Sequence, residues 1–220
     1  MIGEPLALHE GQPANNGRRA PRRRSLTRAA LAIGTALVIN TPAAAHIGTG
    51  LPGGVLSGFR HPFSGFDHLL AMISVGLWGA FLGRPLIYVL PVVFPTVMAL
   101  GAVLAMLGYP MPPVEYGIAL SVLVLGCCIA FAFEAPLWLA SFVVAAFALF
   151  HGYAHGKELP SAADPVGYST GFVLATGLLH VCGIGIGALN SRPCGMIATR
   201  SGGGLIAVAG LWFLFRAIHP

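Results

Sequence analysis

A short polar motif opens a long apolar run and carries two imidazoles and a carboxylate. In "HPFSGFDH" these groups belong to His61, Asp67 and His68. The two histidines are seven residues apart, so a continuous helix would place them on one face, although Pro62 and Gly65 make that helix irregular. Neutral imidazole is a ligand for Ni, Zn, Cu and Fe, and a carboxylate neutralises part of the ion's charge. The motif therefore indicates a metal site.

A second motif, "FHGYAHGKE", has the same kinds of side chain. His151 and His155 are at helical positions i and i+4, and Glu158 follows at i+7, so all three line one stripe of a helix. If the two motifs lie at the same depth, up to four imidazoles and two carboxylates converge. The alternative for each motif is a structural pair that fixes a helix end, in which Asp67 would pair with a nearby histidine or with Arg60.

The composition indicates which kind of element must hold these motifs. Of the 220 residues, 56% are hydrophobic and 9% are charged, and the mean hydropathy is +0.80. Soluble domains carry roughly 25% charged residues. The chain is therefore expected to be a polytopic membrane protein rather than a soluble enzyme. Half of the twelve basic residues lie between Arg18 and Arg28, so no basic patch for nucleic acid remains elsewhere.

Residues 1–45 are predicted to be a leader with a cleavable signal peptide. Arg18 to Arg28 form a basic region, Ala29 to Ile39 form an apolar run, and residues 43–45 supply an A-x-A cleavage site. An uncleaved anchor is the alternative. Cleavage would make His46 the new amino terminus, where its amine and imidazole could chelate a divalent ion and capture metal.

Residues 46–220 are predicted to form one all-α domain, a polytopic transmembrane helix bundle of about six spans. Each break between the apolar segments contains Pro or Gly, as connections should. The expected spans are residues 65–83, 86–107, 116–133, 137–151, 166–189 and 203–215.

The orientation follows from the arginines of the loops, because cytoplasmic loops are enriched in basic residues. With the mature amino terminus outside, Arg84, Arg192 and Arg200 fall on the cytoplasmic side. Both polar motifs then lie at the outer surface of the inner (cytoplasmic) membrane, on the first and fourth spans. His180 lies roughly 15–20 Å deeper along the fifth span, at 1.5 Å per residue. His180 and Met72 are either packing residues or further stops on a translocation path.

Three segments resemble the HupE/UreJ family of nickel permeases. "HPFSGFDHLLAMISVGLWGA" is similar to the family's first-span signature, "FHGYAHGKELP" to its second signature, and "GFVLATGLLHVCGIGIG" to its fifth span. The resemblance covers residues 46–220 and implies a cleaved signal, about six spans, and nickel import that serves hydrogenase or urease maturation. It implies that the metal-site residues are His61, Asp67, His68, His151, His155 and Glu158.

The predicted function is a permease for divalent nickel that works by secondary or facilitated transport. The sequence contains no nucleotide-binding motif, so we expect no nucleotide and no tightly bound cofactor, only the transported ion and the lipid bilayer as partners. We expect no enzymatic activity. The alternatives are a membrane-embedded metalloenzyme, a carrier of another divalent ion such as cobalt, and an assembly factor that uses the glycine-rich faces. Association into a homo-oligomer is left open.

Overall fold

The structure is a computed structural model that describes residues 54–159 and 164–219. The chain divides into two compact units, residues 1–40 and 41–220, and all described residues belong to the second. The predicted leader and His46 lie outside the described residues. Within the described ranges the secondary structure is helical, with no strand. The elements are α2 (Val55–Ser64), α3 (Phe66–Leu82), α4 (Leu86–Met106), α5 (Val114–Ala130), α6 (Leu137–Glu158), α7 (Pro165–Gly187), the 3-10 helix η3 (Ala188–Ser191) and α8 (Pro193–Ile218).

The helices are long and apolar enough for a membrane bundle. α4, α6, α8 and the segment formed by α7 with η3 each have the length and hydropathy of a span, and α2 with α3 forms a further bent candidate. α3 and α5 have 17 residues each, near the lower limit of about 17 for a transmembrane helix. The predicted class, a polytopic helical bundle, is confirmed.

A helix lies at each of the six predicted spans, but two spans are longer than predicted. α6 continues past residue 151 to Glu158 and so includes the whole second motif. α8 begins at Pro193 rather than at residue 203, because proline is well suited to the first turn of a helix. The polar residues that made residues 190–202 resemble a loop have partners: the Thr199 hydroxyl bonds to Asn190, and Arg200 Nε donates to the Ala130 carbonyl at 3.0 Å.

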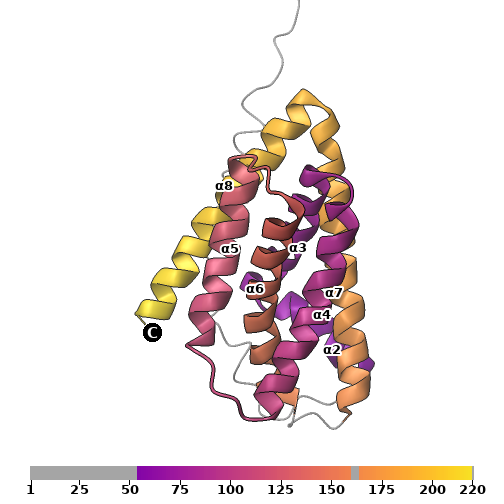
Figure 1. Cartoon of the computed structure of the whole chain (residues 1–220), viewed down its shortest axis with the longest axis vertical. Helices are drawn as coiled ribbons and strands as arrows, with labels where there is room; N and C mark the ends of the chain where they lie inside the picture. The colour runs from indigo at the N-terminus through magenta and orange to yellow at the C-terminus, as the bar shows by residue number, and fades with distance from the viewer. Residues whose placement is uncertain (1–53, 160–163, 220) are drawn as a thin grey trace, which may run out of the picture. The chain divides into compact units, whose positions relative to one another are not determined.

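The first span also differs from the prediction, because a separate helix precedes it. His61 lies in α2, and α2 and α3 meet at Gly65 with a bend of 90°. The sequence predicted only an irregular first turn at this place. Figure 1 shows α2 beside the lower part of α7, away from the axis of α3. His61 therefore approaches the other site residues from a different element than Asp67 and His68.

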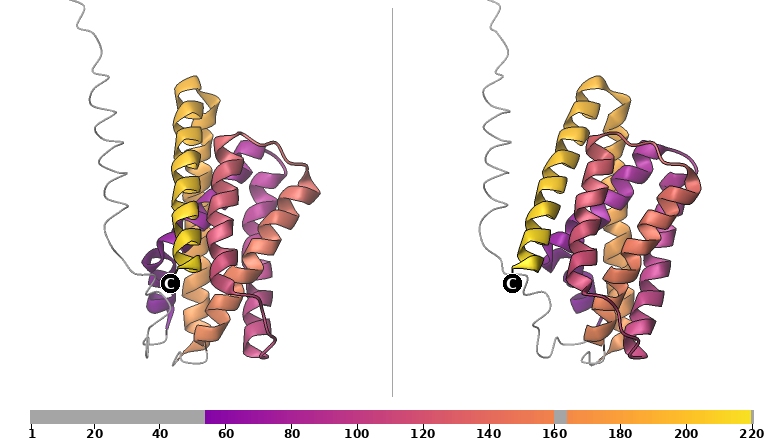
Figure 2. Two further views of the ribbon diagram at one scale, coloured as in Figure 1. Left: turned by 90° about the vertical axis from the view of Figure 1, so that its left-hand side faces the viewer. Right: turned by 60° about the vertical axis from the view of Figure 1, so that its left-hand side comes forward.

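Neighbouring helices pack in pairs that bring distant segments together. α4 packs along α6, α5 along α8, and α7 contacts both α2 and α3. Both views of Figure 2 show α7 and α8 joined through η3 at one end of the bundle. Two glycines permit close approach: a Cβ at Gly171 of α7 would overlap the carbonyl of Val55, and one at Gly152 of α6 would overlap that of Met98. Small residues of this kind let transmembrane helices approach backbone to backbone.

The apolar core lies between α3, α4, α5, α6 and α7, next to the polar residues. Its largest fully buried side chains include Trp78, Met72 and Phe94. Trp78 Nε1 donates to the Phe133 carbonyl at 3.1 Å, which satisfies the one polar group of that ring. This packing leaves the histidines of α3 and α6 facing one another at one end of the core.

Candidate metal centre

Three residues from two helices form a compact group of donors, which we call the triad: His61, His155 and Glu158. His61 Nε2 lies 3.4 Å from Glu158 Oε2, and His155 Nδ1 lies 3.7 Å from the same oxygen. One ligand atom from each residue can be chosen so that all three lie within 4.8 Å of one another. With metal–nitrogen bonds of about 2.1 Å, two ligand atoms on one ion are at most about 4.2 Å apart. Three ligand atoms on one tetrahedral ion lie about 3.4 Å apart, so the widest separation in the triad must shorten from 4.8 Å by roughly 1.4 Å before all three bind the ion.

Two further histidines, His68 and His151, form what we call the buried pair. Their ring centroids are 4.8 Å apart, and the ring of His155 lies 4.7 Å from that of His68. His151 is fully buried, whereas the Glu158 side chain keeps 19% of its surface exposed. The donors thus form a graded series, from a carboxylate near the surface to imidazoles inside the bundle.

Asp67 orients His68 rather than joining the triad. Its Oδ1 accepts hydrogen bonds from the backbone N–H and from ring Nδ1 of His68, both at 2.8 Å. An ionised carboxylate only accepts, so the ring proton of neutral His68 is on Nδ1 and the lone pair is on Nε2. A carboxylate bound to the far side of a ligand imidazole is a common way to fix its tautomer and raise its basicity.

Ser121 of α5 plays the matching role for His151. The Ser121 hydroxyl donates its one proton to the Ile118 carbonyl at 2.6 Å, and its oxygen lies 2.9 Å from His151 Nε2. The serine oxygen must then accept from Nε2–H, which leaves the lone pair of neutral His151 on Nδ1. Both members of the buried pair are therefore held in a defined tautomer.

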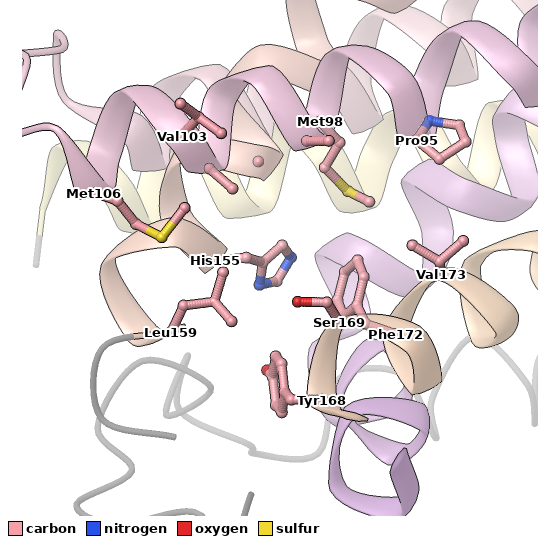
Figure 3. A pocket seen from close by; sticks show the side chains of 13 residues that line it. Pro95, Met98, Val103, Met106, His155, Leu159, Tyr168, Ser169, Phe172 and Val173 are labelled. Carbon is pink, nitrogen blue, oxygen red and sulfur yellow. The ribbon is translucent and has the colours of Figure 1, made fainter. Parts of the chain in front are cut away.

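Aromatic side chains of α7 form one wall of the triad. The Phe172 ring lies 4.4 Å from that of His155, and the Tyr168 ring lies 5.7 Å from that of His61, both between centroids. A cavity of about 240 Å³ reaches His155 between α4, α6 and α7. Figure 3 shows the ring of His155 pointing into it, across from Tyr168 and Phe172. Its walls are mainly apolar, so it is a poor approach for a hydrated dication.

The residues predicted for a deeper path are inside the bundle. His180 is 1% exposed, and its ring contacts Phe94 with centroids 5.4 Å apart. Met72, one helical turn from His68 along α3, is fully buried in the same apolar core as Phe94. A direct role of Met72 as a soft ligand stays a prediction.

The structure brings all six predicted motif residues to one end of the bundle, with Asp67 as the orienting partner of His68. The sequence did not single out Ser121, Phe94 and Phe172. Ser121 had one signal, a hydroxyl inside a predicted apolar span. The two phenylalanines had none, because aromatic residues inside apolar helices are ordinarily core.

The arrangement can bind a borderline divalent cation. Neutral imidazoles with fixed tautomers suit Ni, Zn, Cu and Fe, and Glu158 supplies negative charge. Charged and ionisable groups inside a membrane are usually functional or paired, and here they lie close to one another.

Comparison with known proteins agrees with the motifs. The profile of the family described as HupE / UreJ protein matches residues 34–213. The chain belongs to the HupE/UreJ family. It is 44% identical over 177 residues to Protein HupE of Rhizobium leguminosarum bv. viciae, an alignment that covers 80% of this chain and 93% of that protein. No solved structure matches the chain. Membership of this family and the apolar helices together identify an integral membrane protein.

Proposed function

We propose that this HupE/UreJ protein is a membrane permease that imports divalent nickel. The observation that carries the proposal is the convergence of the two polar motifs, in which His61 of α2 meets His155 and Glu158 of α6. Nickel is supported by the imidazole-rich donor set and by the family resemblance of the motifs. Supply of nickel to a hydrogenase or urease is the corresponding role, and transport without nucleotide is supported by the lack of a phosphate-binding motif in the sequence.

The proposed location is the inner membrane, with the triad on the outer side. At the end of the bundle far from the triad, Arg84 follows α3, Arg192 lies between η3 and α8, and Arg200 of α8 donates to the Ala130 carbonyl of α5. These arginines favour a cytoplasmic location for that end. The triad then faces the side from which nickel arrives. The graded burial from Glu158 to His151 supports capture at the surface followed by passage inward.

Removing one histidine from each group tests this function. We expect His68→Ala and His155→Ala each to reduce uptake of labelled nickel by intact cells to the level of cells without the protein, because each removes a central donor. Protein abundance in the membrane fraction is measured in parallel. His219→Ala is the control, since His219 is exposed at the end of α8 and its ring bonds only to the Phe215 carbonyl within the described residues.

Two results test whether the two motifs share one site and whether that site prefers nickel. Uptake near that of the wild-type chain in both site variants would contradict a shared site. Excess cobalt, zinc or magnesium is added to the wild-type chain to measure its preference for nickel. We expect cobalt to inhibit nickel uptake at a lower concentration than magnesium does, because imidazole favours borderline ions.

A further inference from the structure

A fully buried phenylalanine lies between the buried pair and a histidine that the proposed site does not use. The Phe94 ring centroid is 5.6 Å from that of His151 and 5.4 Å from that of His180. The ring contacts therefore continue from the triad through the buried pair to His180. The centroid distances along this series are 4.8 Å for His61–His155, 4.7 Å for His155–His68 and 4.8 Å for His68–His151. Phe94 is the ring in the series that offers no ligand atom.

His180 has the properties of a ligand rather than of a packed core residue. It is 1% exposed, and neither ring nitrogen has a hydrogen-bond partner among the described residues. Buried polar side chains nearly always have a partner, because a buried donor or acceptor without one loses its hydration and gains nothing in return. An imidazole in this state would gain from binding a cation.

A second donor beside His180 comes from the backbone of α4. Pro95 has no N–H, so the carbonyl of Pro91, four residues earlier, loses its helical donor. This carbonyl lies near the His180 ring. Carbonyls released at prolines in membrane helices are commonly satisfied by other groups or line a polar cavity.

We propose that His180 and the Pro91 carbonyl form a second cation site, and that Phe94 is the barrier between this site and the buried pair. The inference rests on the proposed permease function and adds a route beyond the histidines of the two motifs. Rings in contact on both sides of Phe94 leave no room for a hydrated ion. An ion therefore passes from His151 to His180 only after losing water and when the Phe94 side chain turns aside.

The site is tested with the full-length chain purified into liposomes, with labelled nickel outside. His180→Ala is expected to lower the maximal rate of nickel entry about tenfold and to change the half-saturating concentration less than twofold, because capture takes place at the triad. His180→Gln is measured as a second variant that keeps a polar group of similar length. Thr176→Ala is the control: Thr176 is one turn away on α7, fully buried, and its hydroxyl likewise has no partner among the described residues.

The barrier is tested separately by replacing the Phe94 ring with smaller side chains. Phe94→Ala is expected to admit magnesium, detected with a magnesium-sensitive dye inside the liposomes, because a water-filled gap lets hydrated ions pass. Phe94→Leu keeps the apolar volume and is expected to exclude magnesium as the wild-type chain does. If Phe94→Ala excludes magnesium and takes up nickel at the wild-type rate, Phe94 is not a barrier.

The outcomes for the inner site and for the permease itself are distinct. Normal nickel entry in the wild-type chain and in His180→Ala would overturn the inner site and leave the permease intact. A raised half-saturating concentration at an unaltered maximal rate would place His180 in the capture site and also overturn the proposal. No nickel entry with the wild-type chain would overturn the permease and the inner site together.

Discussion

At the scale of single residues, the site depends as much on the groups behind the histidines as on the histidines themselves. Asp67 holds the proton of His68 on Nδ1, and Ser121 holds that of His151 on Nε2. In each ring the other nitrogen is the one with a lone pair. The hydrogen bonds therefore choose which atom can bind metal before any ion arrives.

Replacing Asp67 by Asn should weaken nickel binding without removing a member of the triad. The amide keeps the size of the side chain but removes the charge that supports the His68 ring. Loss of such an outer partner typically costs 10–100-fold in metal affinity, so we expect the half-saturating nickel concentration for uptake to rise by about that factor.

The matched control for this change is Glu115→Gln. Glu115, like Asp67, is an acidic residue in the first turn of a helix, but it is exposed on α5. We expect the half-saturating nickel concentration of the Glu115→Gln variant to stay within twofold of the wild-type value. Equal effects of the two substitutions would mean that general surface charge, rather than the Asp67–His68 bond, sets the affinity.

The residues that bind metal were predictable, and the residues that position them were not. Histidines and carboxylates in apolar sequence are conspicuous, because their burial is costly without a function. Ser121 and Phe94 are compatible with ordinary packing of an apolar helix. Their roles depend on which side chain of another helix they meet, and the spacing within one helix does not contain that information.

At the scale of helices, the bend between α2 and α3 sets the geometry of the triad. The sequence predicted His61 and His68 on one face of an irregular helix, but His61 lies on a separate helix that packs against α7. Nothing in the sequence signalled a separate helix beyond Pro62 and Gly65, which indicated only an irregular first turn. The 90° bend lets His61 reach Glu158 of α6, which a straight helix carrying His68 would not do.

The contact of α2 with α7 can be tested through one glycine. In Gly171→Ala the new methyl group would overlap the Val55 carbonyl and approach Phe59 N, so α2 must move away from α7. Overpacking of this kind costs about 1–3 kcal/mol. Nickel binding must then draw His61 back against that strain, which lowers the affinity. Because about 1.4 kcal/mol corresponds to a tenfold change in affinity, we expect the half-saturating nickel concentration in uptake assays to rise about tenfold.

Gly177→Ala on the same helix is the matched control. A Cβ there has nothing within 4 Å, and alanine is the better helix former. We expect wild-type uptake from this variant. Wild-type uptake from Gly171→Ala as well, at equal protein level, would show that the position of α2 does not control the site.

At the scale of the whole described bundle, charge is divided between the two ends. The end with the triad also carries the acids Glu115 and Asp164 besides the bases Arg60 and Lys157, whereas the far end carries Arg84, Arg192 and Arg200 with one acid, Glu134. The class and the positions of the long helices followed from hydropathy, since spans of about 20 apolar residues are a strong signal. The pairing of helices did not follow, because in a chain that is apolar throughout, the faces that meet are chosen by small residues and shape.

The proposed orientation makes a prediction about two positions at opposite ends of the bundle. Cys194 is exposed at the start of α8, at the arginine-rich end, and Pro112 is exposed in the link between α4 and α5, at the end with the triad. In a background where Cys127, Cys128 and Cys182 are replaced by Ser, a membrane-impermeant maleimide applied to spheroplasts should not label Cys194 until the cells are lysed. A chain that also lacks Cys194 and carries Pro112→Cys should be labelled before lysis, because positive-inside places the acidic end outside. The reverse pattern would place the triad on the cytoplasmic side, and the graded series of donors would then collect metal from inside the cell rather than import it.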